Sequence, residues 1–223
     1  MALNIAMDGP VSAGKSSVAD EVARRLGILH LDTGAMYRAL GLTVLRRGMD
    51  PTDEKAITDL CLSLDITVTY AEDGQHTWVA GEDVTGLIRT PEVSMAASTV
   101  SRYSEVRKAM VRLQQRLAAE TDMVVDGRDI CTTVLPNATV KIFLTASAEE
   151  RARRRYMEMR EKGMTETYEQ VLEELKKRDE QDMNRPVEPL RKAEDATLLD
   201  STNLSFDQVV ERILTIVGEK QHG

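Results

Sequence analysis

The chain is organised around Gly9-Pro10-Val11-Ser12-Ala13-Gly14-Lys15-Ser16-Ser17, which matches the Gly-x-x-x-x-Gly-Lys-Ser pattern of a phosphate-binding loop, the P-loop. The apolar run at residues 3–7 predicts a buried strand before it. Apolar residues at helical spacing from Val18 to Leu26 predict a helix after it, with Gly27 as its end. A Gly-rich turn that carries Lys-Ser by chance is the alternative, but the flanking strand and helix favour a nucleotide-binding loop.

Each residue type in this loop suits a nucleoside triphosphate. Gly9 and Gly14 let the backbone approach a ligand closely. The loop N–H groups and the positive end of the helix dipole together bind phosphate oxygens. Lys15 can reach the β- and γ-phosphates, and the Ser16 hydroxyl can bind Mg²⁺. We therefore expect all residues of this loop to bind ATP, with Mg²⁺ as the cofactor.

The composition favours a single cytoplasmic domain. The 223 residues, 42% of them hydrophobic and 30% charged, are enough for one core and a polar surface. No apolar run approaches the roughly 18 residues of a membrane span, and the early first strand leaves no room for a signal peptide. Cys61 and Cys131 show neither metal-binding nor disulfide spacing, which indicates a reducing compartment. The net charge of −8 argues against nucleic-acid partners. We expect small-molecule substrates, ATP among them, no membrane association and a monomer.

Strands and helices alternate along the rest of the chain, which predicts a parallel sheet with helices on both faces. Strands are predicted at residues 29–31, 123–125, 140–144 and 196–200, and helices at 33–47, 51–64, 90–100, 104–120, 147–163, 165–182 and 205–217. Residues 66–70 and 76–80 instead predict a β-hairpin that turns at Gly74. We interpret this hairpin as an inserted subdomain, because it lies between helical segments.

Two stretches are candidates for a second binding site. Thr33, Tyr37 and Arg38 share one helical face, which either lines a cleft or is ordinary surface, and the residues leave both readings open. Asp126-Gly127-Arg128-Asp129 ends a buried strand, where open α/β sheets bind their ligands. Arg107, taken by itself, is expected to be a solvated helix residue.

Arginines crowd the two helices predicted at residues 147–163 and 165–182. An antiparallel pair with arginines on the facing sides would form a lid over phosphates. A solvated hairpin held by Glu–Arg pairs is the alternative, and some of these arginines belong to it. Ser147-Ala148-Glu149-Glu150 has the capping-box form expected where the first helix begins.

The remaining motifs narrow the class of P-loop protein. A guanine-reading Asn-Lys-x-Asp is absent and the chain is short for a motor ATPase, so a small metabolite kinase fits best. The P-loop is followed in order by Asp32-Thr33-Gly34-Ala35-Met36-Tyr37-Arg38, Asp126-Gly127-Arg128-Asp129 and Arg178-Asp179-x-x-Asp182-x-Asn184-Arg185. With these motifs the chain resembles the bacterial cytidylate kinases over essentially its whole length. Lys15-Ser16-Ser17 departs from the more usual Lys-Gly-Thr or Lys-Ser-Thr but keeps both hydroxyls, so we expect no loss of function.

The resemblance implies the fold and its division. The expected fold is α/β, a three-layer P-loop kinase with a five-stranded parallel sheet, an inserted small β subdomain and a helical lid, all in one domain of residues 1–223. The core would comprise about residues 1–32, 121–147 and 193–223, the monophosphate-binding part about 33–120, and the lid about 148–185.

The resemblance also implies the small-molecule substrates, ATP and CMP or dCMP, and the reaction, which is in-line transfer of the γ-phosphoryl group of Mg-ATP to CMP or dCMP without a covalent intermediate. The acceptor phosphate is already anionic near neutral pH, so no general base is needed. His30, His76 and His222 accordingly look incidental. The closest alternatives are a kinase for uridylate, adenylate or shikimate, and a regulatory protein that senses ATP without phosphorylating a metabolite.

Roles for individual residues follow from the same resemblance. Asp129 would accept from the cytosine amino group, while Arg107 and Ser98 would donate to the ring acceptors. The catalytic residues would be Lys15, Arg128 and Arg154. The monophosphate would be held by Arg38, Arg128 and Arg185, and the sugar hydroxyls by Arg178 and Asp182. The same pocket would be lined by Thr33 and Tyr37.

Overall fold

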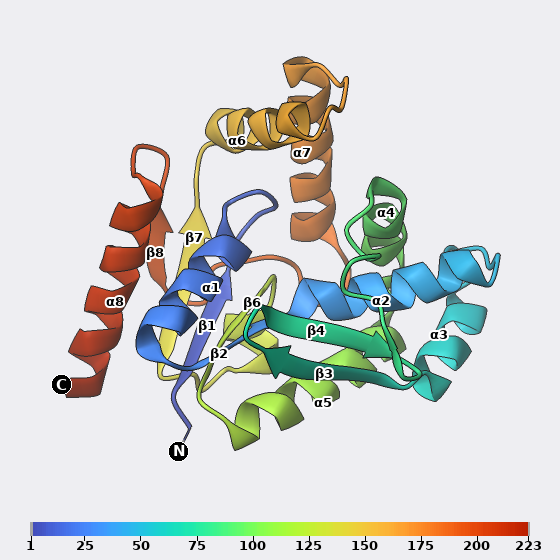
Figure 1. The fold of residues 1–223 in the computed structure, drawn as a ribbon, viewed down its shortest axis with the longest axis horizontal. Coiled ribbons are helices and arrows are strands. Elements are labelled where there is room, and N and C mark those ends of the chain that lie inside the picture. Colours follow the sequence, from blue (N-terminus) through green and yellow to red (C-terminus); the bar gives the residue numbers. More distant parts are fainter. Residues whose placement is uncertain (1, 223) are drawn as a thin grey trace.

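A parallel β-sheet forms the centre of the protein, as Figure 1 shows in a computed structural model that describes residues 2–222. The strands lie in the order β2-β6-β1-β7-β8, and every neighbouring pair is parallel. The strands are β1 (Asn4–Asp8), β2 (Leu29–Asp32), β6 (Met123–Gly127), β7 (Val140–Thr145) and β8 (Thr197–Asp200). This arrangement confirms the predicted five-stranded parallel sheet.

Helices cover both faces of this sheet and give the molecule three layers (Figure 1). The helices are α1 (Lys15–Leu26), α2 (Thr33–Arg46), α3 (Glu54–Ser63), α4 (Pro91–Val100), α5 (Ser104–Glu120), α6 (Ala148–Glu161), α7 (Tyr168–Asn184), α8 (Phe206–His222) and one π-helical turn, η1 (Ile130–Val134). Among residues 2–222, no helix is both long enough and apolar enough to span a membrane.

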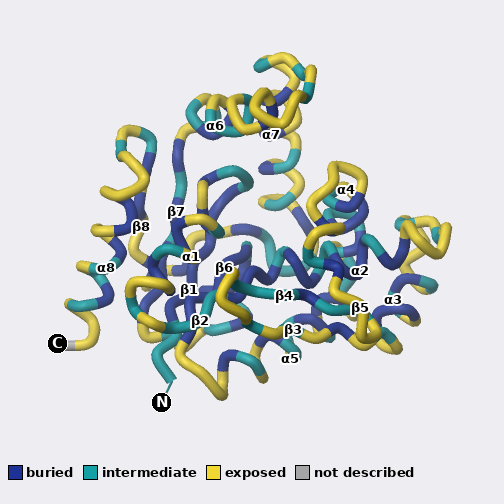
Figure 2. Tube along the Cα trace, in the orientation of Figure 1, coloured by how far each residue is buried: buried dark blue, intermediate teal, exposed yellow. Residues whose placement is uncertain are grey.

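The two faces of β1 show how the core is divided. Ile5 and Met7 belong to an apolar cluster that includes residues of α1 and α8. Ala6, which points to the opposite face, belongs to a second cluster with residues of α2 and α5. Because both faces are covered, the central strands are buried on both sides (Figure 2).

The predicted hairpin is present as a small antiparallel sheet of β3 (Ile66–Ala71), β4 (Gly74–Val79) and the short β5 (Glu82–Asp83). Gln75 joins this sheet to the core. The Asp32 backbone N–H donates to Gln75 Oε1 at 2.7 Å, and Gln75 Nε2 donates to the Asp32 carbonyl at 3.3 Å. The inserted sheet is therefore fixed to the carboxyl end of β2.

Helices α6 and α7 project from the core together (Figure 1). They share a small apolar cluster of their own, which includes Ala152, Met159, Val171 and Leu175. Figure 1 shows the two helices crossing, so the predicted antiparallel pair is wrong. Arg151 is one of the arginines whose role the sequence left open, and it is buried. Its Nη2 donates to Asp179 on α7 at 2.6 Å and its Nη1 to the Val11 carbonyl at 2.9 Å.

Several predicted boundaries shift in the structure. Helix α7 begins at Tyr168 rather than near residue 165, because the Thr167 side chain accepts from the Gln170 backbone and caps the helix there. Strand β6 continues to Gly127, so Asp126 belongs to the strand and not to the turn after it. The capping role predicted for Ser147 is confirmed, since its hydroxyl accepts from the Glu150 backbone at 3.2 Å.

Gly41 in α2 packs closely against the backbone of α4. A Cβ added at Gly41 would lie 2.9 Å from the Ala97 nitrogen and 3.1 Å from the Val93 carbonyl oxygen, both on α4. We expect Gly41→Ala to lower the free energy of unfolding by about 1–3 kcal/mol, because the backbone of α4 must move. Urea unfolding of the purified variant measures this change.

Gly218→Ala is the matched control in α8. No heavy atom lies within 4 Å of a Cβ added there. Alanine favours a helix over glycine, so this variant should be neutral or gain about 0.5–1 kcal/mol. Equal unfolding midpoints for the two variants would contradict the close contact between α2 and α4.

Candidate active site

The P-loop connects β1 to α1 with three residues in the left-handed region: Gly9 at φ 154°, Ser12 at φ 57° and Gly14 at φ 86°. A Cβ added at Gly9 would lie 1.9 Å from the Leu144 carbonyl oxygen on β7, so no other residue fits there. Gly14 forms the N-cap of α1. The loop therefore has the strand, turn and helix that the sequence predicted, with its backbone at the start of α1.

Lys15 lies under this loop and is buried. Its ammonium donates to the Pro10 carbonyl at 2.8 Å. Burial, together with the charge of Arg128, lowers the pKa of Lys15 to about 7, although Asp126 and Asp8 act in the opposite direction. An anionic ligand in the loop would offset this burial and favour the charged ammonium, which is the behaviour expected of a phosphate-binding lysine.

The Ser16 hydroxyl faces a carboxylate that sequence reasoning missed. Ser16 Oγ, in the first turn of α1, donates to Asp126 Oδ2 on β6 at 2.9 Å. The signal was available, because Asp126 was part of a predicted motif but no role was given to it. The hydroxyl and the carboxylate together present hard oxygen atoms beside the P-loop.

His30 contacts the other oxygen of this carboxylate, a structural contact that the sequence did not indicate, and its lack of a catalytic role stays a prediction. His30 Nε2 lies 2.8 Å from Asp126 Oδ1, and Nδ1 lies 3.2 Å from Asp20 Oδ1 on α1. Burial opposes a charge on the imidazole, but the hydrogen bonds to Asp126 and Asp20 outweigh it and raise the pKa of His30 to about 10. The imidazole is therefore a cation at neutral pH, between two carboxylates.

The face of α2 predicted from the sequence does point toward the site. Thr33 Oγ1 donates to the Asp126 carbonyl at 2.7 Å. Arg38 Nη2 donates to Asp32 Oδ2 at 2.7 Å, while Arg38 Nε is buried and has no hydrogen-bond partner among the described residues. Thr33 is therefore buried against β6 rather than exposed, and the binding role of this face stays a prediction.

Arg128 and Asp182 also meet. Arg128 Nε, just after β6, donates to Asp182 Oδ2 near the end of α7 at 2.9 Å. The contact joins the carboxyl edge of the sheet to α7. Asp182 was predicted to hold sugar hydroxyls, and in this structure one of its oxygens is occupied by Arg128.

Arg107 is not the solvated residue that its sequence context suggested, because only 2% of its side chain is exposed. It forms ion pairs with Asp129 and with Glu188, and the distance between Arg107 Nε and Glu188 Oε2 is 2.6 Å. The ring of Tyr37 lies 5.8 Å from the guanidinium carbon. Sequence reasoning missed Glu188, since it lies in a loop with no recognisable motif.

Arg185 completes this group. Its Nη2 lies 3.4 Å from Asp129 Oδ1 but makes no hydrogen bond among the described residues. Its Nε donates to the Glu188 carbonyl at 2.5 Å. Arg107, Asp129 and Arg185 thus lie together, and their roles toward base and phosphate stay predictions.

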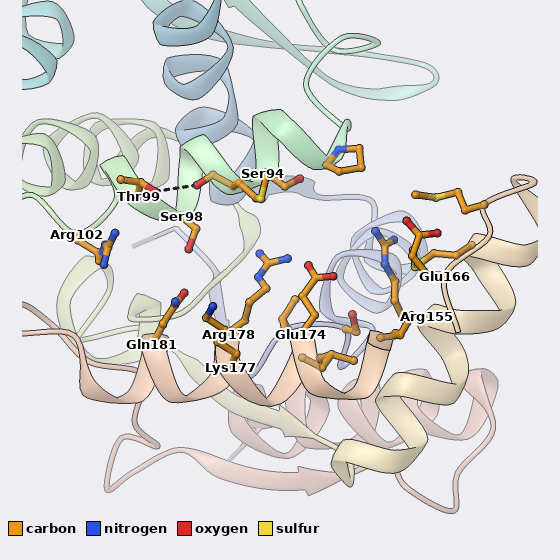
Figure 3. A pocket seen from close by; sticks show the side chains of 18 residues that line it. Ser94, Ser98, Thr99, Arg102, Arg155, Glu166, Glu174, Lys177, Arg178 and Gln181 are labelled. Atoms are coloured by element: carbon orange, nitrogen blue, oxygen red, sulfur yellow. Dashed lines mark hydrogen bonds between the residues drawn. The ribbon is translucent and has the colours of Figure 1, made fainter. Parts of the chain in front are cut away.

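Ser98 and Arg178 lie apart from this group, in a cavity of about 400 Å³ lined by residues of α4, α6 and α7. Figure 3 shows them pointing toward one another across it. Arg155 of α6 and the P-loop residues Val11 and Ser12 also line this space, so it reaches from the lid to the nucleotide loop. The structure does not bring Ser98 into contact with Arg107 or Asp129, and the base-reading role of Ser98 stays a prediction.

Arg154 faces a different cavity, of about 350 Å³, lined by Gly14, Ser17 and Phe206 among others. Its Nη2 donates to the Ser201 carbonyl at 2.7 Å and its Nε to Glu150 at 2.8 Å. Arg154 therefore lies beside the start of α1 and away from the arginines near Asp129. Its role in closing over phosphates stays a prediction.

Comparison with known proteins identifies the family. A family model described as cytidylate kinase matches residues 5–219. The chain belongs to the cytidylate kinase family. Similar proteins include the cytidylate kinase of Caldicellulosiruptor bescii, 51% identical over 214 residues that cover 96% of this chain and 95% of the relative. That of Bacillus subtilis is 49% identical over 218 residues, which cover 98% and 97%.

Solved structures show the fold alone. An uncharacterized protein from Eubacterium ventriosum matches with a TM-score of 0.55 at 12% identity, covering 97% of this chain and 98% of the other. Shikimate kinase from Bacteroides thetaiotaomicron matches with a TM-score of 0.50 at 10% identity, with the same coverage. The likeness to the shikimate kinase agrees with the kinase-type α/β/α architecture of this cytidylate kinase family member.

The His30 contacts predict a specific pH dependence of stability. The pKa of His30 rises from an ordinary 6.5 to about 10 on folding, so protonation favours the folded state. The resulting stabilisation is fully present below pH 6.5 and is lost as the pH rises through about 10. His30→Gln should therefore be less stable than the wild type at pH 6, with a gap that narrows toward pH 10.

Urea unfolding of both proteins without nucleotide, across this pH range, measures the gap. Lys15 titrates in both proteins, so the difference between the two curves reports on His30. Parallel curves would show that the imidazole is not held as a cation.

Proposed function

We propose that the protein transfers the γ-phosphoryl group of ATP to CMP and releases ADP and CDP. Membership of the cytidylate kinase family supports this activity. The observation that carries it in the structure is a pair of buried guanidinium donors, Arg38 Nε and Arg185 Nη2, which have no hydrogen-bond partner among the described residues. Buried donors of this kind are costly unless a ligand satisfies them, and phosphate oxygens suit a planar guanidinium.

The phosphate of CMP would lie among Arg38, Arg128 and Arg185. Each of these arginines already has one ion-pair contact with a carboxylate, from Asp32, Asp182 and Asp129 respectively. The carboxylates orient the guanidinium groups. Arg38 Nε would be free for the phosphate, and so would Arg185 Nη2, which lies 3.4 Å from Asp129 Oδ1 without a hydrogen bond to it. Positive charge so placed would also favour the transition state, in which charge spreads over the transferred phosphoryl oxygens.

The cytosine would bind at Asp129 and Arg107. Asp129 Oδ2 accepts from Arg107, and Oδ1, which lies 3.4 Å from Arg185 Nη2, would accept from the exocyclic amino group. Uracil carries an oxygen at that position, so its carbonyl would face the carboxylate without a proton between them. Mismatched buried polar groups of this kind discriminate strongly between bases.

ATP would bind through the P-loop, with Lys15 against the β- and γ-phosphates. Ser16 Oγ and Asp126 Oδ2, 2.9 Å apart, fit a Mg²⁺ ion, which prefers hydroxyl, carboxylate and phosphate oxygens. When bound, this ion would neutralise phosphate charge. The adenine would occupy the cavity beside Gly14 and Phe206, where Arg154 is held by Ser201.

The sugar site, the lid and the oligomeric state are also part of this proposal. The sugar would lie near Arg178 and Asp182 on α7, and dCMP would be accepted as well as CMP. The part of the chain around residues 33–120 would bind the monophosphate, and residues 148–185 would close as a lid, with Arg154 and Arg155 toward the phosphates. We also propose a cytoplasmic monomer.

The first test measures ADP release from Mg-ATP with CMP, dCMP, UMP, AMP and shikimate. We expect strong stimulation by CMP and little by UMP. Lys15→Ala should reduce turnover by at least about 100-fold, because it removes the buried cation beside the phosphates.

Each other outcome has a distinct meaning. Stimulation by another acceptor would keep the kinase fold and replace the substrate. ATP binding with no stimulation by any acceptor would favour a nucleotide-sensing protein. Near-normal activity of Lys15→Ala would overturn the assignment of the P-loop.

A second test addresses base recognition. Asp129→Ala should raise KM for CMP by at least about tenfold and KM for ATP by less than about twofold, because Asp129 contacts only the acceptor side of the site. Asp129→Asn replaces an acceptor by a possible donor and should narrow the preference for CMP over UMP. Steady-state kinetics with each nucleotide varied measures both effects.

Asp59→Ala, an exposed change on α3, is the control. It should leave KM for CMP, KM for ATP and the preference for CMP over UMP unchanged. Equal increases in KM for CMP and KM for ATP in Asp129→Ala would show that Asp129 does not bind the base.

A further inference from the structure

The base pocket contains a second carboxylate to which the motifs give no role. Glu188 lies in the loop between α7 and β8, and 29% of its side chain is exposed. Its carboxylate accepts from Arg107 Nε at 2.6 Å, and its backbone carbonyl accepts from Arg185 Nε at 2.5 Å. One loop residue thus holds both arginines that contact Asp129.

The three nitrogens of Arg107 donate to three different acceptors. A guanidinium commonly places two N–H groups on a single carboxylate, in a bidentate pair. Here Nε goes to Glu188, Nη2 goes to Asp129, and Nη1 goes to the Ser101 carbonyl at 3.2 Å. Glu188 therefore occupies the donor that would otherwise complete a bidentate pair with Asp129.

This division leaves one oxygen of Asp129 without a hydrogen bond from Arg107. Asp129 Oδ2 accepts from Arg107, whereas Oδ1 lies 3.4 Å from Arg185 Nη2, which makes no hydrogen bond among the described residues. A bidentate Arg107 would engage both oxygens. The carboxylate would then have no free oxygen facing a base, and it could not distinguish an amino group from a carbonyl.

The backbone of Glu188 adopts a conformation that is unusual for its residue type. Its φ is 49°, in the left-handed region that residues other than glycine rarely adopt. In this conformation the residue makes two arginine contacts, one through its carbonyl and one through its carboxylate. Glycine would adopt the same conformation without strain.

The balance of charge in the pocket also supports a role for Glu188. The buried guanidinium groups of Arg107 and Arg185 face two carboxylates, Asp129 and Glu188, so the pocket is balanced before a neutral base enters. Without Glu188 the two cations would share one carboxylate. Both would then draw on Asp129, and the pocket would favour a base that presents an acceptor in place of the amino group.

We propose that Glu188 is a positioning residue for base specificity, which splits the donors of Arg107 so that Asp129 keeps one oxygen for the amino group of the base. This inference rests on the proposed phosphorylation of CMP. It predicts that the loss of the Glu188 carboxylate affects the nucleotide monophosphate and leaves ATP unaffected.

The test compares Glu188→Gly, Glu188→Gln and the wild type. Glu188→Gly removes the carboxylate and relieves the backbone strain, so it should fold normally. We expect its preference for CMP over UMP, as the ratio of kcat/KM values, to fall about tenfold through a higher KM for CMP, with KM for ATP within about twofold of the wild type. Glu188→Gln keeps an acceptor oxygen and should restore most of the preference.

Two measurements accompany the kinetics. Calorimetric titration of CMP and UMP into each protein without ATP gives the same comparison as dissociation constants, independent of turnover. Thermal unfolding shows whether a variant is folded. Glu194→Gly is the matched control, because Glu194 is an exposed residue of the same loop, and it should leave the preference unchanged.

The outcomes separate the inference from the proposed function. An unchanged CMP preference in Glu188→Gly, or an equal loss for CMP and UMP together with a lower unfolding midpoint, would overturn the positioning role. A wild-type protein that CMP does not stimulate would overturn the proposed function itself. A loss of preference in Glu188→Gly that Glu188→Gln restores would support both.

Discussion

The parallel pairing of β1 with β6 is the constraint on which the site depends. It places Met7 beside Asp126 and Asp8 beside Gly127, so the P-loop and the acceptor-side motif leave the sheet at the same edge. Asp8 strengthens this junction, because its buried carboxylate accepts from the backbone N–H groups of Ile130 and Cys131, each at 2.8 Å. The strand that begins the nucleotide loop therefore also fixes the turn that carries Asp129.

Around this edge, arginines and carboxylates alternate. Arg38, Arg107, Arg128 and Arg185 each contact at least one carboxylate, from β2, the turn after β6, α7 or the loop after α7. Buried guanidinium groups are costly unless they are paired, and paired groups keep fixed orientations. The protein has a net charge of −8, so this group of arginines is a local concentration of positive charge in an acidic protein.

Much of the architecture could be predicted because it depends on local patterns. The alternation of apolar strands and amphipathic helices indicated the parallel sheet, and Gly74 marked the hairpin. Helix boundaries were less certain, since caps such as Thr167 depend on a single side-chain contact. The arginines of α6 could not be assigned individually, because their helical spacing is the same whether they face solvent, a buried aspartate or a cavity. Arg151, Arg154 and Arg155 proved to have three different environments.

The sequence by itself determined the nucleotide loop, the fold class and the family, because these depend on residue types at fixed spacing along the chain. Tertiary structure alone decided the contacts between segments far apart in the sequence. His30 holds Asp126 across 96 positions, and Glu188 reaches Arg107 across 81. Neither contact has a local signature, since an imidazole or a carboxylate acquires its role only when folding buries it beside an opposite charge and removes the water that would otherwise screen them.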